Sequence, residues 1–146
     1  MDDLDRAIIM HLQQDGRLTH SQLAERIGLT PSPVLRRVKR LEQDGVITGY
    51  RARIDPVAAG RSFEVMVTAE LRVNNRENVE AFEEQVASFD EVVECRRLFG
   101  LPDYLIWVAV ADLESFERFL TAKLMDLPAV ARVSSHFTMR VVKSRA

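Results

Sequence analysis

The chain has 146 residues, 47% of them hydrophobic and 29% charged, with a formal net charge of −2 at pH 7. These values exclude disordered and fibrous proteins and allow one folded domain or two small ones. The single cysteine excludes a disulfide within the chain and fits a reducing compartment. The first residues are acidic, unlike a signal peptide, and no apolar run approaches the ~18 residues that span a bilayer. We therefore expect a cytoplasmic protein with no membrane partner.

Two short helices are predicted at the start of the chain. The first begins after an aspartate cap at position 2 or 3, has an apolar stripe along one face, and ends at Gly16. Thr19 and Gln22 form a capping-box pair that starts the second helix. Gly28 ends it, because a residue without a side chain permits the left-handed backbone that a sharp turn needs.

The third predicted helix carries the strongest functional signal. It begins after Thr30, with Pro31 at the first position, where a missing N–H costs nothing, and it ends at Gly45. Its outward face contains four cations in five positions: Arg36, Arg37, Lys39 and Arg40. A short helix, a glycine turn and a cationic second helix are typical of a helix-turn-helix motif that reads the DNA major groove.

Two interpretations of this cationic face are open. A solvent-exposed helix often carries Lys and Arg that bind nothing. DNA binding is favoured because no acid balances the cluster at i+4 within it, and because the small Ser32 lies in the first turn, where a recognition helix meets base edges. Residues 1–54 carry a net charge of +2 and residues 55–146 carry −4, so the basic patch is local. The DNA interpretation requires that acids of the chain do not cover Arg36, Lys39 and Arg40.

The residue types suggest a role for each candidate DNA contact. Arg36 is the first candidate for a base contact, because its planar fork suits the guanine O6/N7 pair. Lys39 and Arg40 suit phosphates, whereas Arg37 lies at the edge of the helix face and could do either. Arg51, further along the chain, can reach the DNA backbone, although an exposed strand with no DNA contact explains it equally well. The candidate contacts are Ser32, Pro33, Arg36, Arg37, Lys39, Arg40 and Arg51.

A connecting segment follows the helices. Residues 46–54 are β-prone and predict a strand, and Asp55-Pro56 together with Gly60 mark a hinge. We therefore expect a helix-turn-helix domain over 1–45, a connecting strand and hinge over 46–60, and a second domain over 61–146.

The second domain repeats a strand–helix–strand pattern. Apolar alternation and helical spacing predict two such halves in tandem, the β-α-β-β-α-β order of the ferredoxin-like fold. The predicted strands are 63–73, 92–99, 104–111 and 130–143, and the helices are 77–88 and a segment that Asp112 caps, with Leu113, Phe116, Phe119, Leu120 and Leu124 facing inward. The whole chain is therefore expected to be of the α+β class.

The strand predicted over 104–111 is apolar on both faces. In a ferredoxin-like fold the helices cover only one face of the sheet, so a half-exposed strand should alternate apolar and polar residues. A second copy of the sheet packed face to face would cover the other side, and we favour this homodimer. The alternative is a central strand of low polarity with a few exposed side chains.

Several runs of residues resemble one family over essentially the whole chain. They are Leu4-Asp5-Arg6, Asp15-Gly16-Arg17, residues 29–42, residues 45–52, and Gly100 with Asp103-Tyr104. In these runs the chain resembles the Lrp/AsnC ("feast/famine") family of transcription factors. The resemblance implies sequence-specific binding to double-stranded DNA, a C-terminal ligand-sensing domain, and homodimers that assemble into tetramers or octamers. It also implies regulation by an amino acid or a related small metabolite.

The resemblance also implies where an effector would bind. Carried over by position, the site comprises Gly100, Leu101, Pro102, Asp103 and Tyr104 with Ser134, Ser135 and Thr138 of the last strand. Asp103 could bind an α-ammonium group, and N–H groups of the turn a carboxylate. The alternative is a tight turn whose Gly and Pro serve geometry alone. Many members have an acid and an aromatic residue where this chain has Leu101 and Pro102, which leaves the identity of the ligand open.

Enzymatic and metal-binding functions find little support in the sequence. His11, His20 and His136 lie far apart and, with one cysteine, offer no zinc-ligand spacing. No phosphate-binding loop, dinucleotide fingerprint or nucleophile elbow is present in the sequence. We expect no catalytic residues, no cofactor and no metal. A ligand-independent architectural DNA-binding protein is the first alternative to a regulator, and a small enzyme is the second.

Overall fold

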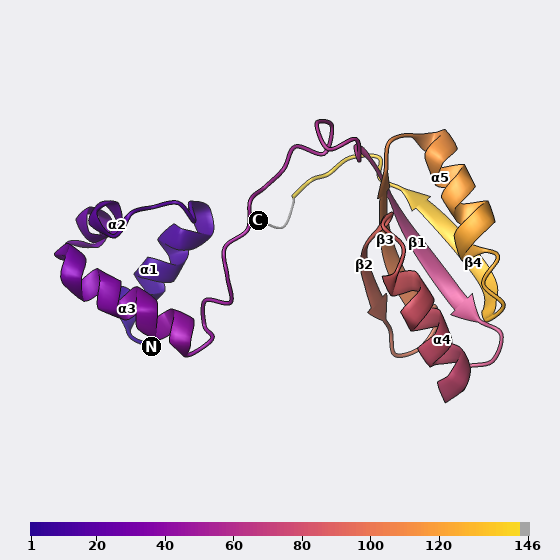
Figure 1. Ribbon diagram of the computed structural model, residues 1–146, viewed down its shortest axis with the longest axis horizontal. Coiled ribbons are helices and arrows are strands. Elements are labelled where there is room, and N and C mark those ends of the chain that lie inside the picture. The colour runs from indigo at the N-terminus through magenta and orange to yellow at the C-terminus, as the bar shows by residue number, and fades with distance from the viewer. Residues whose placement is uncertain (144–146) are drawn as a thin grey trace. The chain divides into compact units, whose positions relative to one another are not determined.

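The computed structural model describes residues 1–143, which divide into two compact units. The first unit, residues 1–53, is helical, and the second, residues 54–142, contains a sheet with two helices (Figure 1). No helix in this range has the length and apolarity that crossing a bilayer requires.

Three helices form the first unit: α1 (Asp3–Gln14), α2 (His20–Ile27) and α3 (Pro31–Gln43). Local chemistry sets both ends of α2 and the start of α3 as the sequence predicts, whereas α1 and α3 each end two residues before the predicted Gly16 and Gly45. The Thr19 hydroxyl accepts from the N–H of Gln22 at the start of α2, and Gly28 ends α2 with a left-handed φ of 70°. Pro31 begins α3. The turn between α2 and α3 is therefore specified by residues within it.

A small apolar core holds the three helices together. Its buried members come from every helix and are Ile8, Leu23, Ala24, Val34, Val38 and Leu41. Burying this stripe of α3 fixes which side of the helix faces outward, because positions three and four apart share a face.

The segment that follows α3 differs from the prediction. Residues 46–54 form no strand, and residues 56–60 form turns. The side chains of this segment favour an extended backbone, but a strand also needs a neighbouring strand for its backbone hydrogen bonds. No second strand of residues 1–143 pairs with this segment.

The second unit has the predicted ferredoxin-like order. Its elements are β1 (Phe63–Leu71), α4 (Arg76–Ala87), β2 (Val92–Arg97), β3 (Tyr104–Val110), α5 (Leu113–Phe119), a π-helical turn η1 (Leu120–Leu124) and β4 (Val130–Phe137). The strands are antiparallel in the order β2-β3-β1-β4. This sheet, together with the helix-turn-helix unit, confirms the predicted α+β fold class.

Helices α4 and α5 lie on the same face of the sheet (Figure 1). The core between them and the sheet includes Val65, Val67, Phe82, Ile106, Phe116 and Phe119. Two details of the prediction are wrong. Leu113 is exposed, because it is the first residue of α5 and lies outside its apolar stripe. The last strand ends at Phe137 rather than 143, because its pairing with β1 ends at that residue.

The opposite face of the sheet carries no helix. Leu105 and Trp107 of the central strand β3 are only half-buried there, and Trp107 lies opposite Met66 of β1. An uncovered strip of large apolar side chains is a common feature of surfaces that pack against another protein. A second sheet of the same kind would cover it, so the homodimer stays our prediction.

Trp107→Glu tests this interpretation. A carboxylate at this position would have to lose its hydration if two sheets packed face to face, so we expect the variant to elute as a smaller particle. Size-exclusion chromatography with light scattering measures this. Leu113→Glu, on exposed α5, is the matched control and should keep the parental size. A Trp107→Glu variant of unchanged size would show that this face stays open within each copy.

Candidate nucleic-acid interface and effector pocket

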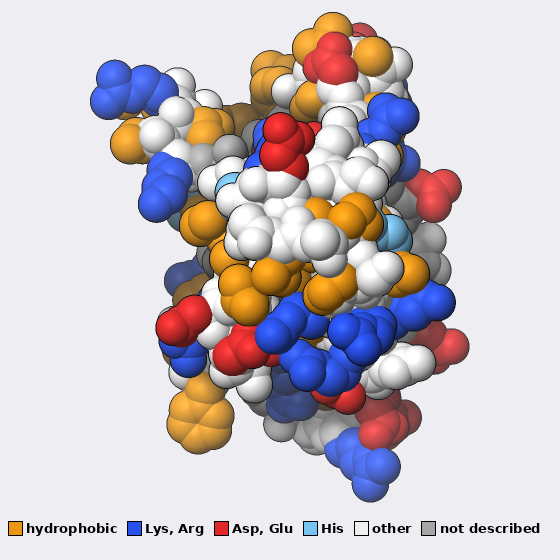
Figure 2. Space-filling view, turned by 90° about the vertical axis from the view of Figure 1, so that its left-hand side faces the viewer, with side chains coloured by type: hydrophobic (Ala, Val, Ile, Leu, Met, Phe, Trp, Pro, Cys, Tyr) orange, Lys and Arg blue, Asp and Glu red, His pale blue; other side chains and the backbone are white. Residues whose placement is uncertain are grey.

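Helix α3 keeps Arg36 and Lys39 clear of the acids of the described chain, as the DNA interpretation requires, but not Arg40, which pairs with Asp5. Arg36 and Lys39 are exposed, and neither forms an ion pair within residues 1–143. Ser32 is exposed in the first turn of α3. Seen from the left-hand side of Figure 1, Lys and Arg side chains gather into one patch with acidic side chains at its edge (Figure 2).

The other two arginines of α3 bond to acids at the start of α1. The Asp5 side chain is only 1% exposed, and its Oδ1 accepts from Nη1 of Arg37 at 2.8 Å. Its Oδ2 accepts from Nη2 of Arg40 at 2.7 Å. Nη1 of Arg37 also donates to Asp2 at 2.7 Å. The side chain of Arg37 is 24% exposed and that of Arg40 is 52% exposed, so Arg40 keeps an open edge whereas Arg37 is largely enclosed.

The same two aspartates close the N-terminus of α1. The N–H of Asp5 donates to Asp2 Oδ1 at 2.9 Å, and the N–H of Asp2 donates to Asp5 Oδ2 at 3.0 Å. This reciprocal capping box helps to hold both carboxylates in place. A buried carboxylate is stable only when it is paired and hydrogen-bonded, and Asp5 meets both conditions.

The acids are held in their ionised form. The N–H of Asp5 and the guanidinium group of Arg37 lower the pKa of Asp2 from 3.8 to about 2. Burial acts to raise the pKa of Asp5, but the Asp2 N–H and the two arginines outweigh it and lower that pKa below 3.8. The pKa of Arg37 is raised by its bonds to Asp5 and Asp2. All three groups are therefore charged at neutral pH.

The arginines of α3 surround a hollow. Pro33, Arg36, Arg37 and Arg40 line a concavity of about 340 Å³ on the outward side of the helix. Arg36 and the exposed part of Arg40 at this hollow suit an anion, because planar guanidinium forks match phosphate oxygens. Arg51 is exposed, but it lies on the connecting segment rather than on a strand. In the sequence, the capping spacing of Asp2 and Asp5 is visible, but their pairing with α3 is not.

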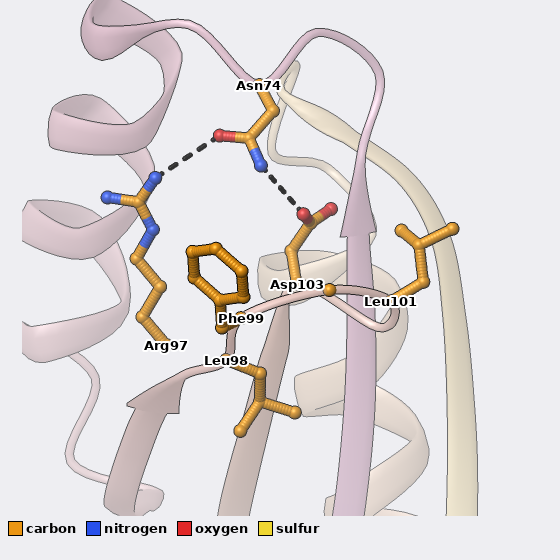
Figure 3. Close-up of a pocket in the computed structure, with 7 residues that line it drawn as sticks. Asn74, Arg97, Leu98, Phe99, Leu101 and Asp103 are labelled. Carbon is orange, nitrogen blue, oxygen red and sulfur yellow. Dashed lines mark hydrogen bonds between the residues drawn. The ribbon is translucent and has the colours of Figure 1, made fainter.

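A second hollow lies at the turn between β2 and β3. It has a volume of about 560 Å³ and is lined by Asn74, Arg97, Leu98, Phe99, Gly100, Leu101 and Asp103 (Figure 3). Three of the predicted effector residues, Gly100, Leu101 and Asp103, are among these. The other five do not line it: Pro102, Tyr104, Ser134, Ser135 and Thr138.

Several predicted effector residues lie outside the hollow. Tyr104 is buried in the core, where its hydroxyl donates to Glu83 at 2.9 Å and burial raises its pKa. Ser134 and Ser135 are neighbours on β4, so their side chains point to opposite faces of the sheet. Thr138 lies beyond the end of β4.

Asp103 is one of the predicted residues in the hollow, and its carboxylate is already engaged. It is 6% exposed, its Oδ2 accepts from the N–H of Leu71 at 2.8 Å, and its Oδ1 accepts from the side-chain amide of Asn74 at 2.8 Å. Asn74, Arg97 and Phe99 also line the hollow and were not among the predicted residues. An arginine and an aromatic residue just before Gly100 were the available signal for two of them.

Family models match both units. A model described as the Lrp/AsnC ligand binding domain matches residues 64–146, and one described as winged helix-turn-helix DNA-binding matches residues 1–48. The Bkd operon transcriptional regulator of Pseudomonas aeruginosa is 36% identical, and the match covers 100% of this chain and 95% of that protein. The leucine-responsive regulatory protein of Escherichia coli K12 is also 36% identical, with 98% and 87% covered.

Solved structures agree with the sequence matches. A transcriptional regulator of Neisseria meningitidis in complex with L-Met superposes with a TM-score of 0.93 at 32% identity, covering 99% of this chain and 93% of that one. An AsnC family transcriptional regulator of Agrobacterium tumefaciens gives a TM-score of 0.90 at 36% identity, covering 99% and 94%.

Replacing Asp5 tests the ion-pair network. Asp5→Asn keeps the shape of the side chain but leaves Arg37 and Arg40 without their buried counter-charge, so we expect the Tm to fall by several degrees at pH 7. Asp3→Asn, in the same turn with its side chain 98% exposed, is the matched control and should change the Tm little. Far-UV circular dichroism of the full chain measures both; equal Tm values would show that the network contributes nothing.

Acid should weaken the same network. A carboxyl whose pKa is lowered by folding stabilises the fold above its unfolded pKa and loses that contribution as the pH falls through its folded pKa. For Asp2 this interval runs from 3.8 to about 2. We expect the urea midpoint of the native chain to fall over this interval, and to fall less in Asp5→Asn. Parallel curves for the two proteins would contradict this.

Proposed function

The chain belongs to the Lrp/AsnC family of transcriptional regulators, and from that premise we propose that its two hollows serve the two tasks of such a regulator. The cationic face of α3 binds DNA, and the hollow at the β2–β3 turn binds a small-molecule effector. The observation that carries the first assignment is the exposed pair Arg36 and Lys39, which no acid neutralises within residues 1–143.

We propose different tasks for the cations of α3. Arg36 reads a base in the major groove, because its exposed fork can donate to guanine O6 and N7 together. Lys39 and the open edge of Arg40 contact phosphates. Arg37 acts as a positioning residue, because Asp2 and Asp5 already occupy its guanidinium group. Ser32 and Pro33 lie close to the bases in the first turn, and Arg51 contacts the DNA backbone from the connecting segment.

A homodimer would present two copies of α3. Two recognition helices on a two-fold axis read half-sites about one helical turn, ~34 Å, apart. Larger assemblies of dimers, tetramers or octamers, would extend contact to further sites on the same DNA. Because DNA is the partner, we place the protein in the cytoplasm, and no catalytic role enters this proposal.

We propose an amino acid or related metabolite as the effector. The relative from Neisseria meningitidis was solved with L-Met, and that structure covers nearly the whole of this chain. An effector that favours one assembly or dimer geometry changes DNA affinity through the coupling of the two equilibria, by ~1–3 kcal/mol in typical cases. A ligand-independent architectural protein would instead bind DNA indifferently to every amino acid tested.

Arg36→Ala tests base reading. We expect the variant to lose about 1–3 kcal/mol on a site selected from a random DNA library, with relaxed preference at one base pair. Fluorescence anisotropy with the selected site and with unrelated DNA measures the difference. Equal losses on both DNAs would assign Arg36 to the phosphates instead.

Lys39→Ala tests phosphate binding. Loss of one phosphate contact should weaken binding to every DNA and reduce the slope of log K against log salt concentration by about 0.9. Arg76→Ala, on exposed α4 of the sheet unit, is the matched control for loss of one positive charge. A slope unchanged from that of the native chain would remove Lys39 from the interface.

A further inference from the structure

The hollow at the β2–β3 turn is built around one arginine. Arg97 ends β2 and lies at the edge of a space of about 560 Å³, within the range of small-ligand sites. Its Nη2 donates to the side-chain oxygen of Asn74 at 3.3 Å. Within residues 1–143 its other guanidinium N–H groups have no side-chain partner.

A chain of hydrogen bonds holds Arg97 in place. The N–H of Leu71 and the amide nitrogen of Asn74 both donate to Asp103, each at 2.8 Å. Donation to Asp103 turns the oxygen of Asn74 toward Arg97, as Figure 3 shows. The buried carboxylate thus fixes the amide, and the amide fixes the guanidinium group. Asp103 therefore positions Arg97 indirectly, through Asn74.

Apolar side chains also line the hollow beside Arg97. The ring of Phe99 lies between Arg97 and Asp103 in Figure 3 and is fully exposed, and Leu98 is partly exposed beside it. A planar guanidinium fork matches a carboxylate in two parallel hydrogen bonds. An exposed aromatic ring next to it offers contact to an aliphatic or aromatic group.

We propose that Arg97 binds the carboxylate of the effector and that Phe99 contacts its apolar side chain. This rests on the proposed effector function and names the chemistry of that same site. Both oxygens of Asp103 already accept hydrogen bonds, and no other acidic side chain among residues 1–143 lines the hollow. Asp103 is also only 6% exposed, so the exposed Arg97 is the charged group that a ligand meets. In this proposal recognition depends on the carboxylate, and an α-ammonium group is not required. The ligand class is that of apolar amino acids together with the corresponding 2-oxo acids.

Comparing each amino acid with its 2-oxo acid and its carboxamide tests separately whether the ammonium group and the carboxylate are needed. Isothermal titration of the full chain would use L-leucine, L-methionine and L-phenylalanine, their 2-oxo acids, and their carboxamides. We expect the native chain to bind at least one amino acid and its 2-oxo acid with similar affinity, and to bind the carboxamide at least about tenfold more weakly, since a hydrogen-bonded charge pair is lost.

Variants of Arg97 and Phe99 assign the two contacts. Arg97→Gln should weaken the acids about tenfold or more without changing the weak carboxamide binding, and Arg97→Lys should weaken them less because it keeps the charge. Phe99→Ser should weaken all three forms alike. Arg118→Gln, on exposed α5, is the matched control and should bind as the native chain does. Far-UV circular dichroism checks that each variant is folded.

The outcomes separate this inference from the proposed function. If a ligand binds the native chain and Arg97→Gln equally, or if its carboxamide binds as well as the acid, the carboxylate role of Arg97 is wrong while the effector function stands. Binding of an amino acid without its 2-oxo acid would overturn the independence from the ammonium group. If no compound binds the native chain, both this inference and the amino-acid effector fail, whereas DNA binding is judged by the Arg36 and Lys39 variants.

Discussion

The buried carboxylate of Asp5 makes the interactions on which the arrangement of the cationic face of α3 depends. It accepts one hydrogen bond from the backbone N–H of Asp2, just before α1, and one from each of two arginines of α3. The apolar core fixes which side of α3 faces inward, but it leaves the long side chains on the other side free to move. Asp5 removes that freedom for Arg37 and partly for Arg40, and leaves Arg36 and Lys39 to solvent. The helix is therefore divided between cations that hold the unit together and cations available to a polyanion.

The sheet unit repeats this arrangement. Asp5 and Asp103 are the two buried acidic residues within residues 1–143. Each accepts from one backbone N–H and from side chains near a concave surface, and in each case an arginine at the rim is held directly or through an amide. A buried acid is costly unless its hydrogen bonds are satisfied, so once satisfied it positions its neighbours firmly. In both units a buried acid therefore orients an arginine at the edge of a hollow.

Adjacent arginines that look alike in the sequence have different partners in the structure. Arg36 and Arg37 are adjacent, yet only Arg37 meets the acids of α1. Arg96 and Arg97 are also adjacent, but Arg96 pairs with Glu94 and stacks on Trp107, whereas Arg97 lines the hollow. Neighbours on a helix differ by about 100° and neighbours on a strand by 180°, so one step along the chain moves a charge to different surroundings. An effector that binds Arg97 and DNA that binds Arg36 would each use the arginine that its unit leaves available.

The sequence by itself determined what depends on neighbours along the chain. The Thr19–Gln22 capping box, the Gly28 turn and the apolar stripes indicated the helices, and alternation or a continuous apolar run indicated the strands, because their causes lie within a few residues. Only the tertiary structure decided what depends on residues far apart. Asp5 meets Arg37 across 32 positions and Asn74 meets Arg97 across 23, and no local pattern records such a pairing. Residues 46–54 are a further example, because their side chains favour a strand but they form none. Strand pairing requires a second segment to hydrogen-bond with, and a local sequence pattern does not show whether one is present.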